Sequence, residues 1–227
     1  RTTPCHREER VYERRGDLKK INGFQMNNKF EFCPKCGSKK IVSVMRTCKD
    51  EAVSLGKMAC ENESPLKWMC PECGFDLYCN VAAAVGVIIS DCENNVLFEV
   101  RAKEPRKGFL AIPGGFIDAE ETAEEGCIRE CREEIGLELS EKDISYIGSF
   151  PNTYEYKDIT YTPCDFFFVV KIPKEKGTIS ELVKKLHREE SEVTSIQIHK
   201  ISTEEDVDAL PIAFPSSVKV LKLFVKK

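Results

Sequence analysis

Two copies of one short cysteine motif place the strongest constraint on how this chain can fold. The motif reads Cys33-Pro-Lys-Cys36-Gly in the first copy and Cys70-Pro-Glu-Cys73-Gly in the second. Each copy puts two thiols on a tight turn, and the glycine that follows relieves the backbone there. Four thiolates suit a tetrahedral zinc ion, whereas a single Cys-x-x-Cys is also typical of a redox pair. Because the two copies match in their proline and glycine, we favour a structural zinc site that draws both motifs together.

The spacing between the two motifs is longer than a zinc ribbon usually needs. Cys36 and Cys70 are separated by 33 residues, against about 15 to 20 in most ribbons of this kind. We therefore expect an insertion within residues 38–69. Cys48 and Cys60 lie in that insertion and are alternative zinc ligands, although neither has the motif around it.

Composition and charge narrow the class of protein. The chain has 227 residues, with 34 Lys and Arg against 38 Asp and Glu, and a net charge of -4. This balance removes the electrostatic attraction to a polyanion and argues against nucleic acid as a partner. The longest apolar run, Val81–Ile89, is far shorter than the roughly 20 residues that cross a bilayer. With 12 cysteines, below the density of a disulfide scaffold, and nothing resembling a signal peptide, we expect a cytoplasmic protein without a membrane partner.

The order of expected elements divides the chain into three parts. Residues 1–29 are rich in Arg and Glu without an apolar stripe and are expected to be a poorly ordered leader. Residues 30–79 form the zinc ribbon with its insertion, and residues 80–227 form the main domain. In that domain we expect a hairpin at the start, a helix after Pro113-Gly-Gly115, and later helices near 179–190 and 215–227. The mixture of strands and helices favours an α/β sandwich around a mixed sheet.

The helix expected after Gly115 carries the chemistry. Glu130, Glu133 and Glu134 fall within one arc of about 100° on a helix. Like charges at this spacing repel each other, so the face is either solvated or neutralised by a cation. Hard carboxylate oxygens select Mg²⁺ or Mn²⁺, and Arg129 can hold a neighbouring glutamate by a forked hydrogen bond.

The spacing around that helix resembles a known family. Gly115-Phe-Ile-Asp-Ala-Glu-Glu121, seven further residues and Arg129-Glu-Cys-Arg-Glu-Glu-Ile-Gly-Leu137 resemble the Nudix box, G-x5-E-x7-R-E-U-x-E-E-x-G-U. Cys131 departs from the pattern at the first aliphatic position, where a small apolar thiol suits a buried site. The resemblance covers residues 80–227 and implies the Nudix α/β/α sandwich around a mixed sheet, here preceded by a small zinc ribbon.

The resemblance also implies an activity and a set of roles. It implies hydrolysis of the pyrophosphate bond in a nucleoside diphosphate linked to another moiety, of the NAD(H), ADP-ribose or FAD type. Glu130 and Glu134 are then the principal ligands of Mg²⁺ or Mn²⁺, and Glu133 and the Gly115 carbonyl complete the site. Arg129 orients these carboxylates.

Other roles remain alternatives at this stage. Glu121 is expected to anchor the junction between loop and helix, and Glu133 is one candidate for the general base. Arg101 and Lys103 are expected to meet substrate phosphates, and Tyr154 to stack on a base. The other candidates for the general base are Glu189, Glu190 and Glu192.

A ribbon ahead of a Nudix domain is similar to the NADH pyrophosphatase group and related bacterial ribbon-Nudix proteins. That group carries a Ser-Gln-Pro-Trp-Pro-Phe-Pro type of motif after the box, whereas this chain has Ser149-Phe-Pro-Asn-Thr-Tyr154-Glu-Tyr156. The resemblance therefore does not identify the preferred dinucleotide. It is also compatible with a homodimer. Two alternative functions stay open. One is a ribbon-Nudix module that senses a nucleotide or binds RNA or protein without turnover, and the other is removal of nucleotide caps from RNA.

Overall fold

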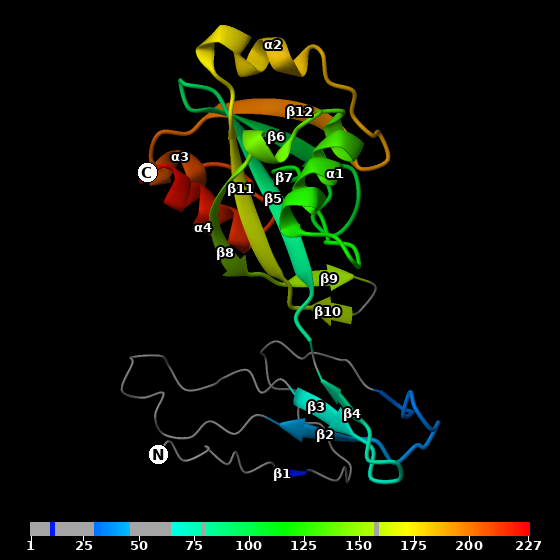
Figure 1. Ribbon diagram of the computed structural model, residues 1–227. Helices are drawn as coiled ribbons and strands as arrows, with labels where there is room; N and C mark the ends of the chain where they lie inside the picture. Colours follow the sequence, from blue (N-terminus) through cyan, green and yellow to red (C-terminus); the bar gives the residue numbers. More distant parts are fainter. Residues whose placement is uncertain (1–9, 12–29, 46–64, 79, 157–158) are drawn as a thin grey trace, which may run out of the picture. The chain divides into compact units, whose positions relative to one another are not determined.

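A computed structural model describes residues 10–11, 30–45, 65–78, 80–156 and 159–227 of the chain (Figure 1). The chain divides into two compact units, one made of residues 1–80 with 158–160 and the other of residues 81–157 with 161–227. Most of the expected leader, and Cys48 and Cys60 in the expected insertion, lie outside the described residues. Two leader residues, Arg10–Val11, form strand β1, because the edge of the next strand offers unpaired backbone groups to an extended segment.

The smaller unit contains an antiparallel sheet and the two cysteine turns. The sheet has the order β1-β2-β3-β4, with β2 at Val42–Met45, β3 at Pro65–Met69 and β4 at Asp76–Tyr78. Trp68 on β3 packs edge-on against Phe30, with 5.5 Å between ring centroids. This contact helps the small sheet to bury apolar surface beside the cysteine turns.

The larger unit is built on a mixed sheet with the strand order β12-β6-β5-β11-β8, and β7 pairs with β6. The central strands β5 and β11 run parallel, and the other pairs are antiparallel. The strands of this unit are β5 at Ala83–Ser90, β6 at Asn95–Arg101, β7 at Leu110–Ala111, β8 at Ser145–Pro151, β9 at Tyr154–Tyr156, β11 at Cys164–Lys171 and β12 at Val193–Lys200. Strand β10, at Ile159–Tyr161, begins in the stretch assigned to the smaller unit.

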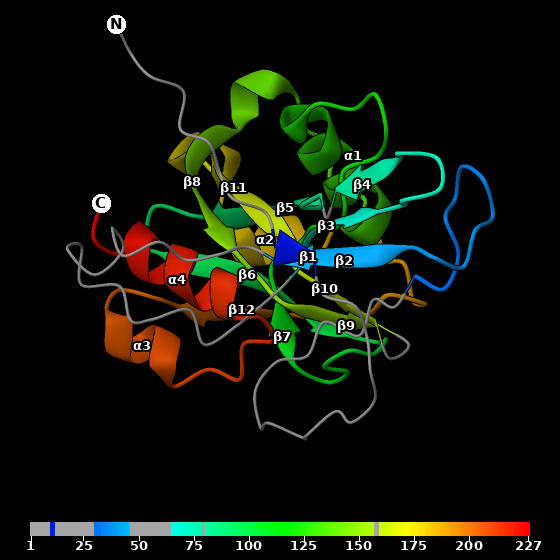
Figure 2. The same cartoon turned by 90° about the horizontal axis from the view of Figure 1, so that it is seen from below.

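Helices cover both faces of this sheet, which confirms the expected α/β/α sandwich (Figures 1 and 2). Side chains alternate along β5, so that Val85, Val87 and Ile89 join one core and Ile88 joins the other. The first core contains the buried face of α1, and the second contains residues of α3 and α4. The helices are α1 at Ala123–Ile135, α2 at Ile179–Val183, α3 at Glu204–Asp208 and α4 at Pro215–Phe224, and 3-10 turns lie at Glu141–Asp143 and Lys174–Lys176.

The second expected helix is shorter than its sequence predicts, because α2 ends at Val183. The segment that follows α2 instead forms hydrogen bonds with the C-terminal end of α1. The backbone N–H of His187 donates to the Ile135 carbonyl at 3.1 Å, and that of Glu189 donates to the Glu134 carbonyl at 2.8 Å. These bonds satisfy carbonyls that a helix end leaves unpaired, so a tertiary contact prevails over local helix propensity.

Within the described part of the chain, every helix is too short or too polar to cross a lipid bilayer.

Candidate active site

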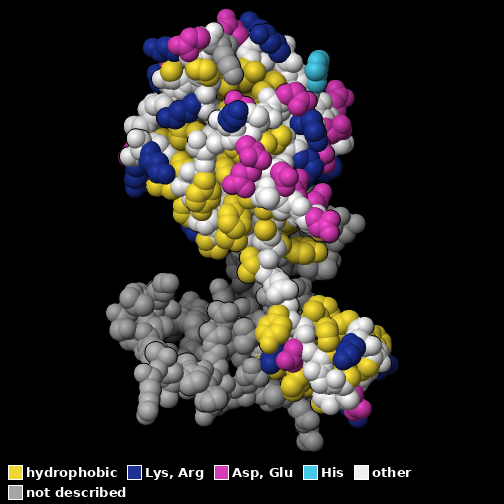
Figure 3. All heavy atoms as spheres, in the orientation of Figure 1, with side chains coloured by type: hydrophobic (Ala, Val, Ile, Leu, Met, Phe, Trp, Pro, Cys, Tyr) yellow, Lys and Arg dark blue, Asp and Glu magenta, His cyan; other side chains and the backbone are white. Residues whose placement is uncertain are grey.

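Local signals at both ends fix the position of α1, the helix that carries the acidic residues. The Thr122 side chain accepts a hydrogen bond from the Glu125 backbone N–H, and the Glu125 carboxylate accepts one from the Thr122 N–H. This reciprocal capping box satisfies two N–H groups at the start of the helix. Gly136 ends the helix with a φ of 67°, a left-handed conformation that suits glycine. Cys127 and Cys131 are fully buried in the core, so one side of α1 is fixed against the sheet, and acidic side chains gather on the molecular surface over this helix (Figure 3).

Arg129 organises the carboxylates around α1. Its guanidinium donates to both oxygens of Glu121, at 2.9 and 3.0 Å, in the expected forked geometry. It also donates to Glu130 at 2.9 Å, to Glu133 at 3.1 Å and to the Phe116 carbonyl at 3.0 Å. The Arg129 hydrogen bond holds the pKa of Glu121 below its usual range. Arg129 therefore ties the loop before α1 to the helix.

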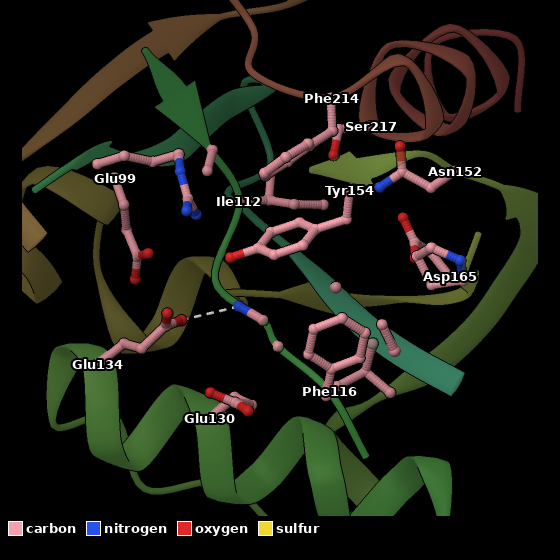
Figure 4. Close-up of a pocket in the computed structure, with 18 of the residues that line it drawn as sticks. Glu99, Ile112, Phe116, Glu130, Glu134, Asn152, Tyr154, Asp165, Phe214 and Ser217 are labelled. Atoms are coloured by element: carbon pink, nitrogen blue, oxygen red, sulfur yellow. Dashed lines mark hydrogen bonds between the residues drawn. The ribbon is translucent and has the colours of Figure 1, made fainter. Parts of the chain in front are cut away.

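The loop Gly114–Gly115 lies directly against the acidic face of α1. The Gly114 N–H donates to the Glu134 carboxylate at 2.8 Å, as the dashed line in Figure 4 marks. A Cβ atom on Gly115 would lie only 2.8 Å from Cδ of Glu130, so glycine is needed for the close approach. The Gly115 carbonyl accepts a hydrogen bond from the Val85 N–H at 2.8 Å, which leaves one lone pair for another ligand.

Burial shifts the acid–base behaviour of two glutamates on α1. Desolvation raises the pKa of Glu134 well above its ordinary value, and the nearby charge of Glu99 acts in the same direction. Desolvation also raises the pKa of Glu130, against the opposing effect of Arg129. A cation beside these carboxylates would favour their ionised forms.

A pocket of about 380 Å³ opens beside this helix. Glu130 and Glu134 line one end of it, and Asn152 and Asp165 line the other (Figure 4). Between the two ends stand the rings of Phe116, Tyr154 and Phe214. Its volume lies within the range of about 300 to 1,000 Å³ that small-molecule sites occupy. A ligand with an anionic part and a flat part would match these walls.

Glu99 is the pocket residue that sequence reasoning missed. It lies on β6 and is 4% exposed, and its Oε1 atom has no hydrogen-bond partner among the described residues. Desolvation raises the pKa of Glu99 to about 8, and the charges of Glu130 and Glu192 act in the same direction. The only signal in the sequence is a carboxylate in the middle of an otherwise apolar strand.

The structure brings some of the predicted site residues together and leaves others apart. Gly115, Glu130, Glu134, Arg101, Lys103 and Tyr154 all line the pocket. Glu133 has a 54% exposed side chain paired with Arg129 and is not among the lining residues. Arg129 and Glu121 act one layer behind the pocket, through their contacts with Glu130 and the loop.

The three remaining candidates for the general base also differ in whether they line the pocket. Glu192 lines the pocket and forms an ion pair with Lys103. Glu190 is 83% exposed and pairs with Arg188. Glu189 accepts a hydrogen bond from the Ser191 N–H at 3.2 Å, and neither Glu189 nor Glu190 is among the lining residues.

The smaller unit brings the four predicted zinc ligands together. The Sγ atoms of Cys33 and Cys73 are 3.7 Å apart, and those of Cys36 and Cys70 are 3.6 Å apart. Zinc–sulfur bonds of about 2.3 Å in a tetrahedron require sulfur atoms about 3.8 Å apart, so the spacing fits zinc. Gly37 and Gly74 each have a positive φ and donate to the first cysteine carbonyl of their motif.

The pocket carboxylates are more widely spaced than the cysteines. Among the described residues, the four cysteines are the only group of three or more whose ligand atoms all lie within 4.8 Å of each other. Mg²⁺ typically keeps several waters and binds through one or two carboxylates, so it does not need such a cage. The close approach of Gly115 to Glu130 and the all-oxygen donor set fit a Mg²⁺ or Mn²⁺ ion.

Residues 81–217 match the NUDIX domain family. The match covers more than half of the chain, so the protein belongs to the Nudix family. This result confirms the resemblance seen at Gly115 to Leu137.

Individual curated relatives match shorter stretches of the chain. An ADP-ribose pyrophosphatase of Methanocaldococcus jannaschii is 40% identical over 78 residues, 34% of this chain and 46% of that protein. A NAD-capped RNA hydrolase NudC of Pseudomonas aeruginosa is 33% identical over 82 residues, 35% of this chain and 27% of that protein. The chain thus matches these two curated relatives over less than half of their length.

A NUDIX hydrolase structure from Nitrosomonas europaea shares the fold, with a TM-score of 0.51 and 21% identity. The similarity covers 87% of this chain and 91% of that one.

Proposed function

We propose that the protein is a metal-dependent hydrolase that cleaves the pyrophosphate bond of a nucleoside diphosphate linked to another moiety, of the ADP-ribose, NAD(H) or FAD type. The observation that carries the proposal is a single pocket that combines buried carboxylates at one end with aromatic walls beside them. Membership of the Nudix family and the relative named an ADP-ribose pyrophosphatase support it.

The chain's residues divide the work in this proposal. Glu130 and Glu134 hold a Mg²⁺ or Mn²⁺ ion, with the Gly115 carbonyl and Glu133 as the further predicted ligands. When bound, the ion supplies charge neutralisation for the diphosphate and activates water. Arg129 fixes the orientation of Glu130 through their 2.9 Å hydrogen bond.

Groups on the other walls of the pocket position the substrate. The Arg101 guanidinium lies 5.0 Å from the Phe214 ring centroid and uses its Nε to donate to the Pro105 carbonyl. Its terminal N–H groups suit a phosphate oxygen. Tyr154, packed edge-on against Phe116 with 5.5 Å between centroids, provides a wall for a flat base.

The reaction needs a group that takes a proton from the attacking water. The water oxygen bonds to one phosphorus, the bond from that phosphorus to the bridging oxygen breaks, and the bridging oxygen leaves with the other phosphate. Among the candidates for the general base, Glu192 is favoured because it lines the pocket, whereas Glu133 is bound to Arg129 and exposed.

A substrate panel tests the proposal. ADP-ribose, NAD, NADH, FAD and diadenosine polyphosphates are incubated with Mg²⁺ or Mn²⁺, and the products are identified by chromatography. ADP-ribose should give AMP and ribose 5-phosphate, and E134Q should lower the rate at least about 100-fold. Saturable nucleotide binding without turnover would instead favour the sensor.

NAD-capped RNA is a second candidate substrate, favoured by the name of the Pseudomonas aeruginosa relative. It contains the same kind of pyrophosphate bond. Because the net charge of this chain is -4, we expect a free nucleotide to be preferred over a polyanion. Comparing kcat/KM for NAD-capped RNA and free NAD decides between them, and a higher value for the RNA would make decapping the main activity.

A further inference from the structure

Glu99 has no evident role in holding the fold together. Leu97, two residues before it on β6, packs into the core that contains α1, so the strand alternation directs Glu99 toward α1 as well. There its carboxylate points toward Glu134, at the same end of the pocket (Figure 4). An apolar residue would suit this buried strand position better, because a buried carboxylate without a positively charged partner is costly.

The two basic side chains that line the pocket have other partners, and the side chain that hydrogen-bonds to Glu99 is another acid. The charge of Arg101 attracts it, yet the Arg101 Nε donates to the Pro105 carbonyl and its guanidinium lies over the Phe214 ring. Lys103 lies in the same pocket but is paired with Glu192. The charges of Glu130 and Glu192 repel that of Glu99, whereas the Glu134 side chain hydrogen-bonds to it and lowers its pKa.

We propose that Glu99 is a ligand of the divalent cation, so that the metal site joins strand β6 to helix α1 and is not confined to the glutamates of the helix. The inference rests on the proposed metal dependence and adds a residue that lies outside the Gly115–Leu137 segment. Two observations support it independently of the acidic cluster: the 4% exposure of Glu99 and the unpartnered Oε1 atom in the pocket wall. A cation would supply the missing partner, as buried charges require.

Mn²⁺ binding without any nucleotide tests the role of Glu99. The zinc-loaded full chain is titrated with Mn²⁺, and free Mn²⁺ is followed by its EPR signal. Mn²⁺ prefers oxygen ligands, so the thiolate site does not compete for it. E99Q, which keeps the shape of the side chain, should lower the Mn²⁺ affinity at least about tenfold or remove one bound ion.

Two further variants serve as positive and negative controls for E99Q. E134Q should lose Mn²⁺ affinity as E99Q does, whereas D165N, which changes another buried acid at the far end of the same pocket, should retain it. If E99Q fails to fold, E99D retracts the carboxylate by one methylene, and a weaker Mn²⁺ titration at unchanged Tm supports the proposal.

The outcomes separate this inference from the proposed function. Unchanged Mn²⁺ affinity in E99Q or E99D, with E134Q weakened, overturns the role of Glu99 and leaves the hydrolase intact. A wild-type chain that binds no Mn²⁺ overturns the inference together with the metal dependence. Equal losses in E99Q and D165N also overturn it, because the effect is then a general response to removing a buried acid.

Discussion

Adding a single methyl group to either of two adjacent glycines should lower a different property of the protein. At Gly115, the methyl group would meet the Glu130 carboxylate, which is the movable end of a side chain. At Gly114, it would meet the backbone of Val85 and Gly86 at a φ of 152°. The first change therefore disturbs a ligand, and the second disturbs the fold.

We accordingly predict that G115A lowers Mn²⁺ affinity about tenfold or more, as loss of a supporting contact does at other metal sites, while its Tm stays near that of the wild type. G114A should lower the Tm of the metal-free protein. Calorimetry together with Mn²⁺ titration measures both effects. A G115A protein that unfolds early but binds Mn²⁺ normally would contradict the assignment.

The ion pair between Glu121 and Arg129 predicts a pH dependence of stability. Because Arg129 lowers the pKa of Glu121 in the folded chain, ionised Glu121 stabilises the fold at pH above its unfolded pKa of about 4.3. That contribution is lost as the pH falls through the lowered folded value. Urea unfolding of the wild type and E121Q should differ by about 2 kcal/mol near pH 7, and the difference should shrink below about pH 4. A pH-independent difference would mean that packing dominates.

Residues along one helix show where sequence reasoning reaches its limit. The pattern around α1 identified Glu130 and Glu134 correctly as pocket residues, because local spacing fixes a helical face. Glu133 falls in the same broad arc, yet it does not line the pocket, and its exposed side chain pairs with Arg129. The role of Glu99 could not be predicted from the sequence, because the residues around it come from a helix remote in the chain. A single glutamate in a strand also forms no periodic pattern that would mark a site.

At the scale of elements, the capping residues fix where α1 starts, and the start of the helix sets where its carboxylates lie along the pocket. The start and end of this helix could be predicted from local residues, whereas the early end of α2 could not. That end depends on hydrogen bonds to the last turn of α1. The same hydrogen bonds anchor the segment that carries Glu192, which lines the pocket. The helix end that the sequence did not predict therefore precedes a segment that forms part of the pocket wall.

Removing the cap of α1 should weaken the fold by a measurable amount. T122A deletes the hydroxyl that accepts from the Glu125 N–H and should cost about 1 kcal/mol of unfolding free energy. T122S keeps the hydroxyl and serves as the matched control. Urea unfolding followed by circular dichroism measures both variants. Equal losses in T122A and T122S would show that the Thr122 methyl group, and not the hydrogen bond, stabilises this end.

At the scale of the whole molecule, the two compact units are stabilised in different ways. The larger one has two apolar cores on the two faces of its sheet. The described residues of the smaller one form a short sheet and four converging thiols, and this part offers too little apolar surface to be stable without a metal. A zinc ion bound by the four thiolates would supply the missing folding energy.

Zinc removal should therefore unfold one unit and spare the other. With a strong chelator, or in C70S, amide hydrogen exchange should become fast in 42–45 and 65–69 while 83–90 and 95–101 stay protected. The reason is that metal binding and folding are coupled in such ribbons, whereas the sandwich retains its own core. Adding zinc back should restore protection in the chelated wild type but not in C70S. Simultaneous loss of protection in both sheets would show that the units fold as one, and unchanged protection in the small sheet would show that zinc is dispensable.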